Sequence, residues 1–200
     1  MDGPVRLPSD VRWTGQLQRL LGDAYSVIEE GLNGRTTDVE YIDRPGCNGL
    51  PYFVPCLLSH APIDVIVIML GTNDLKVQFD RSPESIAGAL GRYVDAIEMD
   101  ARNRGGAPPK LVLVSPVHID DSRPAFVELN GDDFDAASVE KSRHLGAEIG
   151  RLAQLRGASY ADAADAAVVG DDGIHVSVDS QAKLADLIAE TVRRAVSEDS

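Results

Sequence analysis

The sequence predicts an α/β sandwich built on a parallel β-sheet. Short apolar runs alternate along the chain with longer segments in which apolar residues recur at positions i, i+3 and i+4. These are the patterns of buried strands and of amphipathic helices, and their alternation favours a parallel sheet covered by helices. Residues 65–70 are all apolar, as in a strand that is buried on both faces of such a sheet.

The individual elements follow from these patterns in chain order. Strands are predicted at residues 25–29, 63–70, 110–115 and 158–161. Helices are predicted at residues 11–21, 83–103, 138–156 and 179–196. Ser82 followed by Pro83 has the N-cap and first-turn chemistry of a helix start, and Asp179 before Gln181 marks another. The proline-rich stretch 48–62 is expected to form a loop that packs over the edge of the site or makes a subunit contact.

Composition narrows the classes of function. Two hundred residues fit one domain of ordinary size, and 32 acidic against 19 basic residues give a net charge of −13. A chain this acidic has no electrostatic attraction for nucleic acid or for an anionic membrane surface. No apolar run is long enough to span a membrane, and the first residues do not have the pattern of a signal peptide, so a cytoplasmic protein is expected.

The cysteines and histidines give no sign of a metal site in the sequence. Cys47 and Cys56 are expected to be reduced thiols, because two cysteines in a domain of this length do not make a secreted disulfide scaffold. The four histidines are dispersed and lack the ligand spacing of a zinc motif. The sequence therefore predicts no metal.

Three of the loops that follow the predicted strands are expected at one edge of the sheet. Residues 31–37, 71–74 and 116–121 follow the first, second and third strands. Because functional loops of an open α/β sheet lie beyond the carboxyl ends of its strands, the site is expected at this edge.

A candidate acid–base pair lies near the C-terminus, in the sequence Asp172-Gly173-Ile174-His175. On a turn after the last strand, a carboxylate three residues before a histidine can bind one ring nitrogen and leave the other free. This fixes the tautomer and stabilises an imidazolium, as in a serine-hydrolase site. The alternative is a loop histidine that caps the last helix from outside.

Asn73 and Gly34 are candidate donors to an oxyanion. Asn73 follows an apolar strand directly, and there its side-chain amide can donate to a developing negative charge, an effect of about 3–4 kcal/mol. Gly34 can supply a backbone N–H, because a glycine lets the backbone approach a ligand with no Cβ in the way. Taken alone, each has a structural alternative, an Asx turn for Asn73 and a plain turn glycine for Gly34.

Together, residues 30–37, 71–74 and 172–175 resemble the SGNH (GDSL-type) hydrolases, and most of all their bacterial arylesterase/acyltransferase branch. The resemblance extends from about Val11 to the C-terminus. It implies a three-layer α/β/α flavodoxin-like fold and acyl-serine chemistry on carboxylic or aryl esters. Water, an alcohol or peroxide would accept the acyl group.

The resemblance also implies roles for the candidate residues. His175 would be the general base and Asp172 its orienting acid, with Asn73 and the N–H of Gly34 in the oxyanion hole. It further implies that no cofactor is needed, that the substrate is a small ester, and that the protein forms homo-oligomers.

One part of that family's pattern is not found in these 200 residues, namely the strand that ends in Gly-Asp-Ser and carries the nucleophile. In the resembled fold this strand lies centrally, between those predicted at 25–29 and 63–70, and each buried polar group left unpaired costs about 1–3 kcal/mol. We therefore expect one domain over residues 1–200 that is truncated at its N-terminus, with Met1 a misassigned start or an internal methionine. Such a chain would be inactive or nearly so.

No other serine has the surroundings of a nucleophile in the sequence. Ser9 is expected to cap a helix, and Ser115 is followed by a proline, so a strand-to-helix elbow cannot form there. Ser59 has a histidine beside it but no orienting acid nearby.

Two further sets of expectations remain open. Four side chains either line an acyl or alcohol pocket or are simply an exposed lysine and core residues: Lys76, Phe79, Phe126 and Leu129. The alternative functions are a non-catalytic relic that serves binding or assembly, and a flavodoxin-like ligand binder with residues 31–37 as an anion nest. The second is disfavoured, because that loop lacks the spacing of a phosphate-binding signature.

Overall fold

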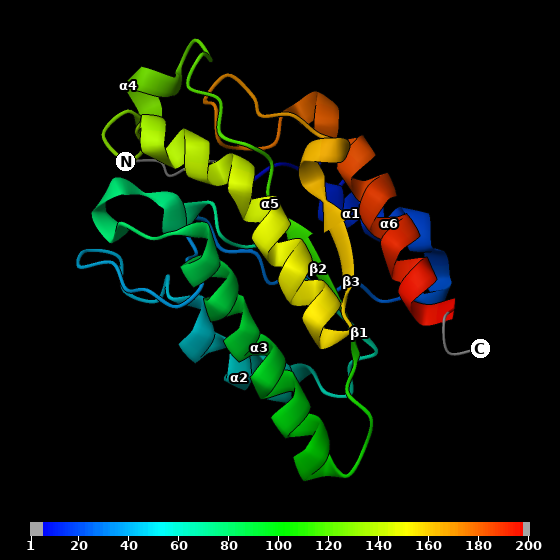
Figure 1. The fold of residues 1–200 in the computed structure, drawn as a ribbon. Helices are drawn as coiled ribbons and strands as arrows, with labels where there is room; N and C mark the ends of the chain where they lie inside the picture. Colours follow the sequence, from blue (N-terminus) through cyan, green and yellow to red (C-terminus); the bar gives the residue numbers. More distant parts are fainter. Residues whose placement is uncertain (1–5, 198–200) are drawn as a thin grey trace.

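A three-stranded sheet lies between two layers of helices in the computed structural model, which describes residues 6–197 (Figure 1). The helices and strands are, in chain order, α1 (Trp13–Leu21), α2 (Gly49–His60), β1 (Val65–Ile68), α3 (Pro83–Arg104), β2 (Lys110–Ser115), α4 (Phe126–Asn130), α5 (Ala136–Arg156), β3 (Ser159–Asp162) and α6 (Gln181–Ser197). The predicted α/β sandwich is confirmed, as are its four main helices to within two residues at either end.

The sheet is parallel throughout and has the order β1-β2-β3. Val67 of β1 lies opposite Val112 of β2, and Leu113 lies opposite Tyr160 of β3. All three strands therefore end at the same edge, which is where the sequence places the functional loops.

Alternate side chains of β2 enter two separate cores. Leu111 and Leu113 pack with α3 and α5, whereas Val112 and Val114 pack with α1 and α6 on the opposite face. Figure 1 shows these two helix pairs on either side of the strands. The two-residue period of a strand thus explains why this run is apolar at every position from 111 to 114.

The segment 48–62 was expected to be a loop, and this prediction is wrong, because residues 49–60 form helix α2. Asn48 caps the helix, with its side chain accepting a hydrogen bond from the N–H of Leu50. Pro51 falls in the first turn, where a missing N–H costs nothing. Pro55 lies inside the helix, and the burial of Leu57 against α3 offsets its cost.

Residues 25–29 were predicted to form a strand but pair with no strand among residues 6–197. Tyr25 has extended backbone angles, and the side chain of Gln18 in α1 takes up part of the segment's hydrogen bonding. Its amide accepts from the N–H of Val27 at 2.7 Å and donates to the carbonyl of Tyr25 at 3.0 Å. The outer edge of β1 is likewise unpaired in this part of the chain.

The predicted helix starts have mixed outcomes. Ser82 caps α3 and accepts a hydrogen bond from the N–H of Ser85, as predicted. The predicted cap at Ser9 is wrong, because α1 begins after Arg12 and has no side-chain cap. A short 3-10 turn, Val178–Ser180, precedes α6 at the start that was marked by Asp179.

Candidate active site

Asp172 and His175 form a hydrogen-bonded pair on the turn between β3 and α6. One carboxylate oxygen of Asp172 lies 2.6 Å from Nδ1 of His175, and the other accepts from the backbone N–H groups of Ile174 and His175, each at 3.0 Å. The imidazole side chain is 66% exposed. The turn thus fixes one ring nitrogen and presents Nε2 to the outside.

The charge of Asp172 is stabilised by these contacts. Burial raises the pKa of Asp172, but hydrogen bonds from the His175 side chain and from the N–H groups of His175 and Ile174 outweigh it, so the net pKa is below the ordinary value. Asp172 is therefore a carboxylate at neutral pH, which is the state that orients an imidazole.

Segments that come earlier in the chain hold this turn in place. The N–H of Asp120 donates to the carbonyl of Gly173 at 2.9 Å, and the side-chain amide of Asn130 donates to the carbonyl of Asp172 at 2.8 Å. Gly173 has a φ of +76°, and a Cβ there would lie 2.4 Å from the carbonyl oxygen of Asp120 and 2.6 Å from the ring of Phe126. Only glycine fits between these neighbours.

Asn73 and Gly34 belong to two loops that meet. The side-chain amide of Asn73 donates to the carbonyl of Arg35 at 3.1 Å, which leaves its second N–H available. Gly34 is buried with a φ of +79°, and its N–H has no hydrogen-bond acceptor among residues 6–197. Among residues 6–197, therefore, one N–H of the Asn73 side chain and the N–H of Gly34 have no acceptor, and Gly34 is next in sequence to Arg35, which Asn73 contacts.

Asp74, to which the sequence pattern assigns no role, connects these two loops through hydrogen bonds. It has no exposed surface, and it accepts hydrogen bonds from the N–H and hydroxyl of Thr37 and from Arg81 at 3.0 Å. Burial raises the pKa of Asp74, opposed by the hydrogen bonds of Thr37 and the charge of Arg81. The acid next to Asn73 therefore ties the loop 71–74 to the residues that follow Gly34.

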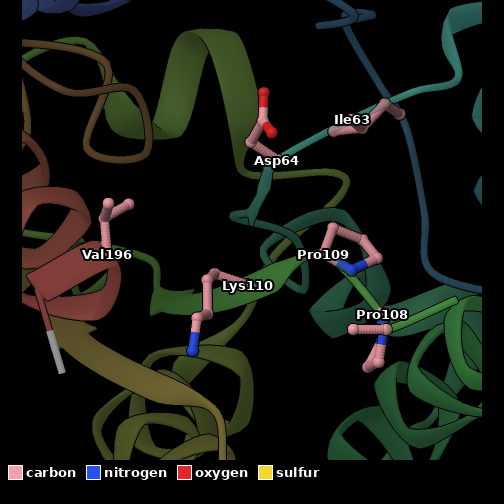
Figure 2. A pocket seen from close by; sticks show the side chains of 7 residues that line it. Ile63, Asp64, Pro108, Pro109, Lys110 and Val196 are labelled. Atoms are coloured by element: carbon pink, nitrogen blue, oxygen red, sulfur yellow. The ribbon is translucent and has the colours of Figure 1, made fainter. Parts of the chain in front are cut away.

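Two hollows lie at opposite ends of the sheet. The one shown in Figure 2, of about 300 Å³, is lined by Asp64, Pro109 and Lys110, at the amino ends of β1 and β2 and away from the candidate site. A second, of about 370 Å³, is lined by residues that include His118 and Asp120, just beyond the carboxyl end of β2. Because Asp120 is bonded to Gly173, this second hollow adjoins the turn of His175.

The sequence left open whether Lys76, Phe79, Phe126 and Leu129 line a pocket, and the structure places them at different depths. Phe126 is buried beneath the turn, and Leu129 is 62% exposed. Lys76 is buried, so the alternative in which it is an exposed lysine is wrong. Its Nζ lies 2.6 Å from a carboxylate oxygen of Asp133. Phe79 stacks edge-on against Tyr41.

Two of the serines that were considered as nucleophiles have structural partners. Ser115 is fully buried and lies 3.0 Å from the hydroxyl of Tyr160, and Ser59 donates to a helix carbonyl, that of Pro55. No helix of the described residues is both long and apolar enough to cross a membrane.

Comparison with known proteins gives a consistent set of similarities. A sequence model of the GDSL-like lipase/acylhydrolase family matches residues 3–183. An acetylxylan esterase from Xylanibacter ruminicola is 26% identical over 204 residues, which cover 90% of this chain but 38% of that protein. The chain thus spans well under half the length of this curated relative.

Two solved structures are similar over almost the whole chain. A carbohydrate acetylesterase from Sinorhizobium meliloti is 35% identical with a TM-score of 0.86, over 95% of this chain and 88% of that one. The inhibitor-bound aryl esterase of M. smegmatis is also 35% identical, with a TM-score of 0.87 over 96% and 88% of the two chains. Both therefore share the overall fold of this chain.

Proposed function

Because the chain belongs to the GDSL-like lipase/acylhydrolase family, we propose that it is an ester hydrolase or acyltransferase that works through an acyl-serine intermediate. The observation that carries the proposal is the pair of Asp172 and His175, in which Nδ1 is bound by a carboxylate and Nε2 is exposed. This is the arrangement required of a general base that takes a proton from a serine hydroxyl.

The charge that develops on the ester oxygen would be stabilised by two donors. Among residues 6–197, the N–H of Gly34 and the second N–H of the Asn73 amide meet no hydrogen-bond acceptor. Donors that are held in place before the reaction stabilise an oxyanion without the cost of reorganising solvent. Asp74 supports both, because it binds the loop that follows Gly34 and adjoins Asn73 in sequence.

We propose that the nucleophile is the serine of a Gly-Asp-Ser strand, a sequence that these 200 residues lack, and that the 200-residue chain has little or no activity. Within residues 6–197 the outer edge of β1 and the extended segment 25–29 pair with no strand, and this supports the proposal, because a parallel strand between them would satisfy both. Its carboxyl end would carry the serine to the same edge as His175.

The substrate class we propose is a small acyl ester. Similar proteins are described as a carbohydrate acetylesterase, an aryl esterase and an acetylxylan esterase, and two of these three names specify an acetyl group. The hollow beside Asp120 would take part of the alcohol or acyl group. A single cytoplasmic domain that forms homo-oligomers and needs no cofactor completes the proposal.

The test is to fuse an apolar strand ending in Gly-Asp-Ser to the N-terminus and to measure hydrolysis of p-nitrophenyl acetate. We expect activity to appear with the fusion and to fall by a factor of about 10⁴ or more in its His175→Ala variant. His144→Ala is the matched control, because His144 also pairs with an acid, with Nε2 2.9 Å from Glu140, on an exposed helix face. Undiminished turnover in the His175→Ala fusion would contradict the role of His175.

A second function remains the non-catalytic relic that serves binding or assembly. It is favoured only by the absence of the nucleophile from the sequence. A fusion that folds cooperatively yet hydrolyses no ester would support the relic, whereas activity in the fusion excludes it.

A further inference from the structure

One face of helix α2 carries three side chains that can bind metals or protons. Tyr52, Cys56 and His60 are spaced four residues apart, so they lie in one row along the helix. Glu30, from the extended segment before the Gly34 loop, reaches this row. One of its carboxylate oxygens lies 2.7 Å from Nε2 of His60, and the other accepts a hydrogen bond from the hydroxyl of Tyr52.

The potential ligand atoms of Glu30, Cys56 and His60 all lie within 4.8 Å of one another. In a tetrahedral zinc site, metal–ligand distances of about 2.0–2.3 Å put ligand atoms roughly 3.3–3.7 Å apart. The ligand atoms that lie farthest apart therefore need to approach by no more than about 1 Å, whereas the Glu30 oxygen and Nε2 of His60, now 2.7 Å apart, need to separate slightly. Glu30 and His60 are 37% and 32% exposed, so solvent can reach the centre.

We propose that Glu30, Cys56 and His60 form a binding site for a thiophilic divalent cation, of which Zn²⁺ is the best match. The reasons are the donor set and the charge. A thiolate, an imidazole and a carboxylate are the ligands that Zn²⁺ takes in proteins, and three of them leave one position for water. A carboxylate and a thiolate together neutralise a divalent cation.

The surroundings of Cys56 set the conditions for binding. Burial raises the pKa of the Cys56 thiol, which also lies beside Tyr52, Glu30 and the guanidinium of Arg35. As at any cysteine ligand, the cation binds the thiolate, and the thiol proton passes to solvent. Arg35 lies over the ring of Tyr52, 4.4 Å from its centroid, and its positive charge weakens binding without blocking the ligands.

A cation bound by Glu30, Cys56 and His60 would link two separate segments of the chain. Glu30 lies four residues before Gly34, and α2 packs on α3, so a bound cation would fasten the start of the 30–37 loop to the helical layer. This inference does not depend on the proposed esterase activity, and it applies to the 200-residue chain as it is.

The test is titration of the 200-residue chain with Zn²⁺ in competition with a chromophoric chelator, and with Co²⁺ followed by absorbance. We expect one equivalent of tight binding, and a thiolate-to-cobalt charge-transfer band in the near ultraviolet. Cys56→Ser should abolish the band, and Cys56→Ser and His60→Gln should each weaken Zn²⁺ binding by more than the 10–100-fold typical of losing an outer partner.

The chain offers two matched controls. Cys47→Ser removes the other free cysteine, and His144→Gln removes another histidine that pairs with a glutamate; both should bind as the unchanged chain does. Circular dichroism and thermal melts without metal show that each variant is folded. Zn²⁺ binding that survives in the Cys56→Ser/His60→Gln double variant, or a cobalt complex with no charge-transfer band, would overturn the proposal.

Discussion

The two halves of the candidate site are built by contrasting means. The amide half (residues 34–37 and 71–74) is anchored by Asp74, which has no exposed surface and whose partners Thr37 and Arg81 come from other segments. The imidazole half (residues 172–175) is a local turn, in which Asp172 binds its own near neighbours and the ring of His175 is largely exposed.

This difference indicates how each half responds to damage. When a buried carboxylate that accepts from several donors is lost, each donor loses a partner that solvent cannot easily replace. A local turn loses less, because solvent replaces the missing partner and the chain connectivity keeps the residues together. The comparison can therefore be tested by the free energy of unfolding as well as by activity.

The largest effect is expected for Asp74→Ala. It leaves the buried N–H of Thr37 without its acceptor and takes one of two carboxylate partners from Arg81, which keeps Asp38, at a cost of about 3–5 kcal/mol in the free energy of unfolding for the groups together. Urea denaturation measures it, with Asp43→Ala, at an exposed loop position, as the control. Equal stability of the two variants would mean that the buried network does not anchor the amide half.

The second largest effect is expected for Gly173→Ala, which tests the close packing of Asp120 and Phe126 against the imidazole half. Gly157→Ala is the matched control, because Gly157 also has a positive φ, +62°, but no atom of a more distant described residue lies within 4 Å of the position that a Cβ would take there. The control should lose about 1–2 kcal/mol for its backbone conformation. Gly173→Ala should lose roughly 1–3 kcal/mol more, because its Cβ overlaps Asp120 and Phe126. Similar losses of unfolding free energy in the two variants would show that Asp120 and Phe126 shift to accommodate the added Cβ at little cost.

The sequence predicted the local features of the fold better than the distant ones. The cap of Ser82 and the contact between Asp172 and His175 depend on residues three apart, so their chemistry can be recognised in the sequence. The bonds of Asp74 to Thr37 and of Asn130 to the turn join residues 37 and 42 positions apart. Composition and periodicity carry no signal for such pairs.

The two wrong element predictions have different physical causes. For residues 48–62, three prolines and a glycine favoured a loop, although Pro51 lies where a helix tolerates it and Leu57 gains burial. For residues 25–29, extended propensity was read as a strand, but a strand also needs a partner for its hydrogen bonds. The metal ligands Cys56 and His60 were overlooked for the first of these reasons, because their four-residue spacing has meaning only on a helix.

The smallest loss of unfolding free energy is expected for Asp172→Asn. Its dependence on pH shows how much the charge of Asp172 contributes to the imidazole half. At neutral pH the variant should lose about 0.5–1.5 kcal/mol of unfolding free energy, because the amide cannot match every contact of the carboxylate with His175. The lowered pKa of Asp172 means that the folded state favours its ionised form. Its contribution to stability is thus present above the unfolded pKa of about 3.9 and is lost as the pH falls through the folded value.

The difference between the unchanged chain and Asp172→Asn should therefore be constant from pH 7 to about 5 and shrink below about 4. Urea denaturation at a series of pH values measures it, with Asp171→Asn as the control, because that neighbouring side chain is exposed and makes no hydrogen bond among the described residues. A difference that persists unchanged at low pH would mean that Asp172 stabilises the turn as a neutral acceptor. The hydrogen bonds that the Asp172 side chain accepts from Ile174 and His175 would then hold the imidazole half without help from its charge.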